Sequence, residues 1–126
     1  MSPLRGIRGA VQAPADTADA IDGSTRELLA EMVERNGVAP ASLVAIWITQ
    51  TPDLTAVHAA SSARALGWRH VPLLGAQEAP IDGQMERVVR ALMIVETDAD
   101  PRSVRHVYLG VTRALRDDLN ETGACE

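Results

Sequence analysis

Two arginines inside otherwise apolar segments are the residues best suited to bind a ligand. Arg8 lies within the short segment 4–11, and Arg90 lies within the apolar segment 88–95. Burying an unpaired guanidinium is costly, so each head group must reach solvent, pair with an internal carboxylate or meet an anionic ligand. Solvent exposure or an internal salt bridge would explain either arginine alone. The two together favour an anion-binding site.

The other polar groups have spacings that suit neither metal binding nor nucleophilic catalysis. The three histidines are twelve and thirty-six residues apart, and Cys125 is the single cysteine, so no metal-ligand spacing occurs. The sequence contains no lysine, which excludes Schiff-base and phosphate-loop lysine chemistry. We therefore expect neither a metal nor a cofactor. Glu78 and Tyr108, taken singly, fit an ordinary strand-end carboxylate and a half-buried aromatic.

The composition predicts one soluble domain. The chain has 126 residues, of which 46% are hydrophobic and 23% charged, enough to bury one core. A net charge of −5 with only 2% aromatic residues disfavours nucleic-acid binding. The longest apolar run, Leu43–Ile48, is too short to span a membrane, and we find no export signal. The lone cysteine fits a cytoplasmic location.

The elements that must position these residues alternate between strands and helices in the first half of the chain. Residues Leu4–Val11 predict a strand with Arg8 on one face and Ile7 on the other. The apolar spacing over Thr17–Asn36 predicts a helix, capped by Asp16 or Thr17 and stopped at Asn36-Gly37. Residues Leu43–Thr49 predict an apolar strand that is covered on both faces.

The second half is less regular. We predict a helix over Ala56–Leu66 and strands over Val71–Ala76 and Arg105–Val111, whereas the pattern of Gln84–Val95 fits either a helix or a strand. The order β-α-β-α-β-β indicates an α/β fold, a small mixed sheet with helices on one face. We expect a single domain over residues 1–119. The polar end of the chain, at 120–126, is expected to be a flexible tail.

Six short motifs occur in a characteristic order along the chain, and together they resemble the monofunctional AroH-type chorismate mutases from about Leu4 to Leu119. They are Arg5-Gly6-Ile7-Arg8-Gly9-Ala10, Thr51-Pro52-Asp53-Leu54, Gly67-Trp68, Val71-Pro72, Gln77-Glu78 and Arg105-His106-Val107-Tyr108-Leu109. The resemblance implies a homotrimer whose sheets form a pseudo-α/β-barrel with active sites between subunits. It also implies that the ambiguous segment around Arg90 is a strand.

The family resemblance implies an activity: the [3,3] rearrangement of chorismate to prephenate in phenylalanine and tyrosine biosynthesis. This reaction needs no nucleophile, proton donor, metal or cofactor. The substrate carries two carboxylates, and its ether C–O bond breaks ahead of C–C bond formation. A site must therefore hold a dianion in a compact shape and stabilise negative charge on the ether oxygen and positive character on the ring.

The resemblance also implies roles for individual residues. Arg90 would meet the ether oxygen and a carboxylate, Arg8 and Tyr108 would hold a carboxylate, and Glu78 would face the developing cation. The resemblance implies further substrate contacts from Arg64, Leu115, Arg116, His58 and the backbone groups of Leu74 and Gly75.

The sequence departs from the family pattern in three places and leaves two other functions open. His58 replaces a bulky aromatic, Ser61 replaces a common lysine, and the Leu73-Leu74-Gly75 run lacks polar or thiol side chains. A trimer of the Rid-type imine deaminase class would also place an arginine between subunits. A non-catalytic trimer that binds a small metabolite would keep the same anion site.

Overall fold

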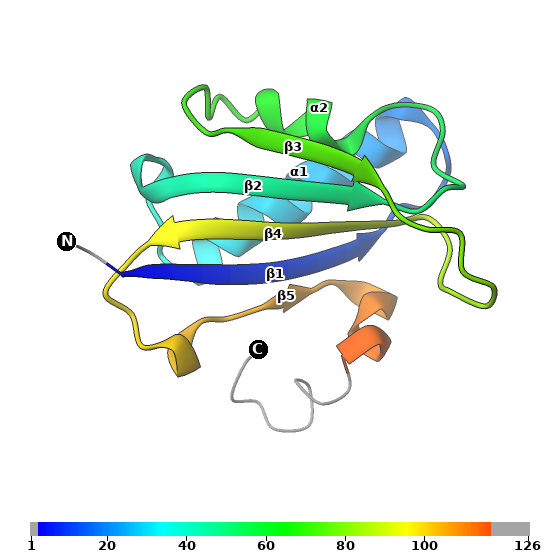
Figure 1. Cartoon of the computed structure of the whole chain (residues 1–126). Helices are drawn as coiled ribbons and strands as arrows, with labels where there is room; N and C mark the ends of the chain where they lie inside the picture. Colours follow the sequence, from blue (N-terminus) through cyan, green and yellow to red (C-terminus); the bar gives the residue numbers. More distant parts are fainter. Residues whose placement is uncertain (1–2, 117–126) are drawn as a thin grey trace.

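The sheet and its helices form two layers. In this computed structural model, which describes residues 3–116, five strands form one mixed sheet in the order β3-β2-β4-β1-β5. Both α-helices pack on the same face of that sheet, which is turned away from the viewer in Figure 1. The strands are β1 (Leu4–Gln12), β2 (Leu43–Gln50), β3 (Leu73–Gln77), β4 (Val88–Glu96) and β5 (Val107–Tyr108), and the helices are α1 (Ala18–Arg35) and α2 (Ala59–Arg64). Three short 3₁₀ segments are η1 (Pro40–Ser42), η2 (Pro101–Ser103) and η3 (Gly110–Arg116).

Helix α1 begins and ends where its capping residues predict. The Thr17 side chain accepts a hydrogen bond from the Ala20 backbone N–H at 3.1 Å, which satisfies one of the free donors of the first turn. At the other end Asn36 follows the last helical residue, and Gly37 has the left-handed φ of +60° that a glycine adopts without strain. Both predicted boundaries of this helix are confirmed.

Strand β1 pairs with β4 on one side and with β5 on the other. The pairing with β4 is antiparallel and that with β5 is parallel. Ile7 and Val11 are buried against the helix layer, while Arg8 is half-buried on the opposite face. Gly9 lets α1 approach closely, since an added Cβ would lie 2.6 Å from the sulfur of Met32. The predicted alternation of this strand is confirmed.

The two faces of the sheet differ in how well they are covered. The helix-covered face carries an aliphatic core that is almost completely buried, including Ile46, Ile48 and Met93. We call the other side the open face. Trp47 and Leu74 on it are 42% and 59% exposed. The prediction that Leu43–Thr49 is covered on both faces therefore does not hold within one chain.

Three elements differ from their predicted extents. The segment around Arg90 is strand β4, as the resemblance implied, so the sheet has one strand more than the order β-α-β-α-β-β contained. Helix α2 covers six residues rather than 56–66, because the chain at 55–57 is held by side chains from elsewhere. Strand β5 has two residues rather than seven, because the chain turns at Gly110, where φ is +57°, into η3.

Residues 117–126 lie outside the described residues. They include the predicted tail at 120–126 and the end of the predicted domain at 119. Within residues 3–116, no helix has the length and apolarity needed to cross a lipid bilayer.

Candidate active site

Strand register places three of the four predicted catalytic residues, Arg8, Arg90 and Tyr108, in two neighbouring rows on the open face. The first row runs across four strands, because Thr49 of β2 pairs with Arg90 of β4, Arg90 pairs with Ala10 of β1, and Ala10 pairs with Tyr108 of β5. Directly paired residues point to the same face of a sheet. Ala10 thus stands between Arg90 and Tyr108 in this row.

The second row lies two residues further along the strands. Leu74 of β3 pairs with Trp47 of β2, Trp47 pairs with Leu92 of β4, and Leu92 pairs with Arg8 of β1. Arg8 and Arg90 therefore come from adjacent strands and share one face, although eighty-two positions separate them in the sequence.

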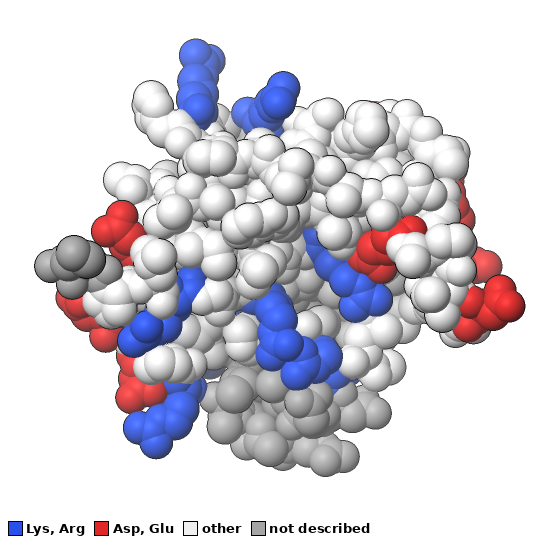
Figure 2. Space-filling view, in the orientation of Figure 1, with Lys and Arg blue, Asp and Glu red and all other residues white. Residues whose placement is uncertain are grey.

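A pocket of about 310 Å³ occupies the space between these rows. This volume is at the lower end of the range for small-molecule sites, ~300–1,000 Å³. Figure 2 shows arginine side chains beside an acidic one in a hollow of this face, where most of the surrounding surface is uncharged. The lining residues are Arg8, Gly9, Trp47, Thr49, Arg90, Ala91, Leu92, Tyr108 and Arg116. Four of the predicted residues thus line one cavity.

Glu78 reaches this pocket through an ion pair with Arg90. The Nε of Arg90 donates to both carboxylate oxygens of Glu78, at 3.0 and 3.3 Å, and the Thr49 hydroxyl donates to Oε2 at 2.6 Å. The Glu78 side chain is 17% exposed and that of Arg90 is 38% exposed. Among residues 3–116, the terminal nitrogens of Arg90 make no hydrogen bond, so they are the part of the fork that can reach an anion.

Arg8 is held by its backbone rather than by its side chain. Its N–H donates to Nδ1 of His106 at 3.0 Å. In the described part of the chain its guanidinium has no hydrogen-bond or ion-pair partner. Burial of the His106 ring, followed by the positive charges of Arg8 and Arg116, lowers the pKa of His106 below its ordinary value. The neutral imidazole, which can accept at Nδ1, is therefore favoured.

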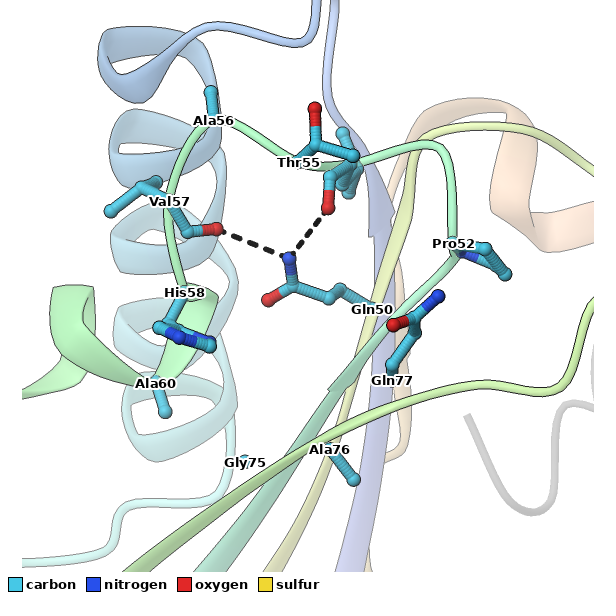
Figure 3. A pocket seen from close by; sticks show the side chains of 11 residues that line it. Gln50, Pro52, Thr55, Ala56, Val57, His58, Ala60, Gly75, Ala76 and Gln77 are labelled. Atoms are coloured by element: carbon cyan, nitrogen blue, oxygen red, sulfur yellow. Dashed lines mark hydrogen bonds between the residues drawn. The ribbon is translucent and has the colours of Figure 1, made fainter.

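Two predicted residues, His58 and Gly75, line a different cavity of about 580 Å³ beside the start of α2. Figure 3 shows His58 on one side of this cavity and Gln77 on the other. The side chain of Gln50 fixes the wall of this cavity. Its amide nitrogen donates to the carbonyls of Leu54 and Val57, and its amide oxygen accepts from the N–H of Ala59 at 2.8 Å. Helix α2 has no capping side chain at His58, so Gln50 supplies the missing acceptor.

The remaining predicted residues do not join either cavity. Arg64 lines a third hollow of about 480 Å³ with Trp68 and Arg69. Leu74 is exposed on the open face beside Trp47, and Leu115 is half-buried in η3 without lining any of these pockets. One chain therefore brings together Arg8, Glu78, Arg90, Tyr108 and Arg116, and leaves His58, Arg64, Leu74, Gly75 and Leu115 apart from them.

Sequence reasoning missed five residues that line the central pocket: Trp47, Thr49, Gly9, Ala91 and Leu92. Alternation along β2 could have indicated the first two, because Trp47 and Thr49 must share a face. Their approach to Arg90 depends on the register between β2 and β4, which local sequence patterns do not contain. Within residues 3–116, no three side chains of the metal-binding types gather at one place.

Comparison with known proteins places the whole chain in one family. A family model described as chorismate mutase type I matches residues 4–119. The chorismate mutase AroH of Thermus thermophilus is 46% identical over 117 residues, which cover 92% of this chain and 96% of the relative. The chorismate mutase AroH of Bacillus subtilis (strain 168) is 39% identical over 120 residues, 94% of each chain.

A solved structure agrees with this result. The chorismate mutase from Clostridium thermocellum superposes with a TM-score of 0.84 at 38% sequence identity, covering 86% of this chain and 97% of that one. By sequence and by fold, the chain belongs to the chorismate mutase type I family.

Proposed function

We propose that this chain catalyses the [3,3] rearrangement of chorismate to prephenate at the pocket on the open face. One observation carries the proposal: the guanidinium groups of Arg8 and Arg90 line a single small cavity together with Tyr108, and Glu78 is paired to Arg90. The substrate is a dianion, and two forked cations on one face suit its two planar carboxylates.

The substrate is bound mainly by residues on the Arg8 side of the pocket. The Arg8 guanidinium has no protein partner among residues 3–116, so it is available to form a bidentate pair with a carboxylate. Tyr108 lies beside it on β5 and adds a hydroxyl donor to the same carboxylate. Arg116 of η3 lines the same cavity and contributes further positive potential. These contacts hold substrate and transition state alike, so they mainly set affinity.

Arg90 is the main contributor to the acceleration of the rearrangement. As the ether C–O bond breaks, negative charge grows on the ether oxygen, and the terminal nitrogens of Arg90 are the donors placed to meet it. Glu78 accepts a hydrogen bond from Nε of Arg90 and thereby fixes the plane of the Arg90 guanidinium before substrate binds. The Glu78 carboxylate faces the positive character that develops on the ring. No bond forms between protein and substrate, and no proton moves.

We infer that the working enzyme is a homotrimer with active sites between subunits. The open face carries apolar side chains that water would otherwise contact, among them Trp47, Leu74 and Leu92. The predicted substrate contacts His58 and Arg64 do not reach the arginine pocket within one chain, so a neighbouring copy must bring them there. A cytoplasmic location and a role in phenylalanine and tyrosine biosynthesis remain predictions from the sequence.

The catalytic test uses purified protein and chorismate. We expect chorismate absorbance to fall with formation of one prephenate per chorismate, unchanged by a chelator. Binding without turnover would indicate the non-catalytic alternative, and turnover of an imine substrate would indicate the deaminase alternative. A requirement for added metal would contradict the mechanism.

The assembly test measures the mass in solution by sedimentation equilibrium. We expect three copies of the 13.4 kDa chain. Trp47→Asp places a charge on the open face and should reduce the mass to that of a single chain. Ile81→Asp, in the loop between β3 and β4 and 62% exposed, is the matched control and should remain trimeric. A wild-type chain that sediments as a monomer with full activity would overturn the inference.

A further inference from the structure

His106 lies where the pairing between β1 and β5 ends. The parallel ladder contains only two pairs, Gly9 with Val107 and Ala10 with Tyr108. The N–H of Arg8, one residue before this ladder, also points to the β5 side. Its acceptor is Nδ1 of the His106 ring, at 3.0 Å. A side chain thus supplies the acceptor that a longer strand would have supplied from its backbone.

The segment that carries His106 is itself fixed to the end of α1. Asn36 donates to the carbonyl of Arg105 at 2.9 Å and accepts from the N–H of Arg105 at 2.8 Å. The same amide donates to the carbonyl of Met32 at 2.8 Å. Hydrogen bonds therefore fix Arg105 to the end of α1, and the next residue, His106, is hydrogen-bonded to the backbone of Arg8.

The ring of His106 can play this part only while it is neutral. A protonated imidazole donates from both nitrogens and has no acceptor for the Arg8 N–H. Two positive charges act on the His106 ring: Arg8 from β1 and Arg116 from η3. Arg105 precedes His106 on the same segment. Helix α1 contributes only the uncharged Asn36 to this region. These surroundings keep the ring neutral at pH 7.

We propose that His106 is a positioning residue: its neutral ring fixes the backbone of Arg8 and so directs the Arg8 guanidinium into the pocket. This role rests on the proposed function, in which Arg8 binds a substrate carboxylate. Because Arg8 mainly sets affinity, loss of the His106 acceptor raises KM for chorismate and leaves kcat little changed.

The test compares two substitutions of His106 with one at a different histidine. In His106→Asn the side-chain oxygen occupies the place of Nδ1 and still accepts, but it does not titrate; His106→Ala removes the acceptor. We expect His106→Ala to raise KM about tenfold at pH 7, and His106→Asn to restore it. His70→Asn, at an exposed residue outside the pocket, is the matched control and should leave KM unchanged.

The pH profile gives the second readout. Because the pKa of His106 is lowered below its ordinary value, KM of the wild type should rise only at a more acidic pH than that of a free histidine, whereas His106→Asn should show a flatter acid limb. An acid limb unchanged in His106→Asn would overturn the role of His106. An equal rise in KM for both His106 variants, with wild-type circular dichroism, would overturn it as well.

A measurement without substrate separates this inference from the proposed function. The amide ¹⁵N–¹H resonance of Arg8 should titrate with the same midpoint as the His106 ring in the wild type, and should not titrate in His106→Asn. A flat Arg8 resonance would refute the hydrogen-bond switch even if the enzyme converts chorismate. Conversely, a protein without mutase activity can still show the coupled titration.

Discussion

The two faces of the same sheet carry different kinds of side chains. On the helix-covered face, β1, β2 and β4 present aliphatic side chains that pack to nearly zero exposure beneath α1 and α2. On the open face the same strands present two arginines and a half-exposed indole, next to the phenol of Tyr108 on β5 and the carboxylate of Glu78 after β3. The alternation of a strand places both sets one residue apart. Stability and chemistry are thus divided by face rather than by segment.

This division explains why charged groups lie in the middle of a central strand. Arg90 is flanked by Val89 and Ala91, both buried on the far side, so the strand is held firmly while the arginine remains available. A rigid element positions a functional group more precisely than a loop does. Changes on the open face should therefore affect activity, and changes on the covered face should affect stability.

The largest effect is expected at Arg90. Arg90→Lys keeps the charge but loses the planar fork, which meets negative charge that appears only during the reaction. We expect kcat to fall by about 10²–10³-fold or more, with a much smaller change in KM. Steady-state kinetics on chorismate measures both constants. Arg102→Lys, at a side chain that is 88% exposed, serves as the control. Retention of most of the turnover would refute the role of Arg90.

On the covered face, Gly9→Ala should cost stability. Its new methyl group would lie 2.6 Å from the sulfur of Met32 and 2.9 Å from Cδ1 of Leu28, so these two fully buried side chains of α1 must repack. Overpacking of this kind costs about 1–3 kcal/mol, measurable as a lower urea midpoint. Gly6→Ala, in the same strand, meets its nearest atom at 3.4 Å and should leave the midpoint nearly unchanged. Equal midpoints for the two variants would contradict the close approach of α1.

Thr49 provides a smaller test on the open face. Thr49→Val keeps the shape but removes the 2.6 Å hydrogen bond to Glu78, which leaves the carboxylate free to rotate away from Arg90. Hydrogen bonds to charged groups contribute about 1.5 kcal/mol or more, so kcat/KM should fall about tenfold. Thr49→Ser retains the hydroxyl and should restore most of the activity. If Val and Ser behave alike, the hydroxyl has no role.

The smallest effect is expected at Asp16, far from the pocket. Its carboxylate accepts from the Thr55 hydroxyl and from the backbone N–H groups of Thr55 and Ala56, and these bonds lower its pKa. A lowered carboxyl pKa stabilises the fold above the unfolded value of about 3.9, and this contribution is lost as the pH falls through the folded value. Asp16→Asn should therefore lower the urea midpoint at pH 7, and its difference from the wild type should shrink as the pH falls below about 3.9 and through the folded pKa of Asp16.

Asp82→Asn, at an exposed carboxylate between β3 and β4, is the control for Asp16 and should change neither midpoint. A difference between wild type and Asp16→Asn that grows toward acid would have the wrong sign for this linkage.

Local sequence signals were enough to predict the regular elements. The faces of β1 followed from alternation, and both ends of α1 followed from Thr17 and Asn36-Gly37. Periodicity left β4 ambiguous, because Val88 and Val89 with Leu92 and Met93 fit helical spacing as well as strand alternation. Only the family resemblance favoured a strand there.

Long-range contacts account for what local signals could not predict. Helix α2 starts late because Asp16 and Gln50, from distant parts of the chain, hold residues 55–57 in a turn. The pocket needed register as well as residue type, so Arg8 and Arg90 could be named in advance while Thr49 could not. The division of predicted contacts between three hollows is also invisible in a linear sequence.

The half-exposed indole on the open face gives this protein its own optical reporter. Trp47 lines the arginine pocket, whereas Trp68, the only other tryptophan in the sequence, packs against the hydrophobic core. Emission from an indole shifts to shorter wavelength when water leaves it. Fluorescence of a Trp68→Phe variant would then follow ligand entry or subunit association at the pocket directly, without a dye or an attached label.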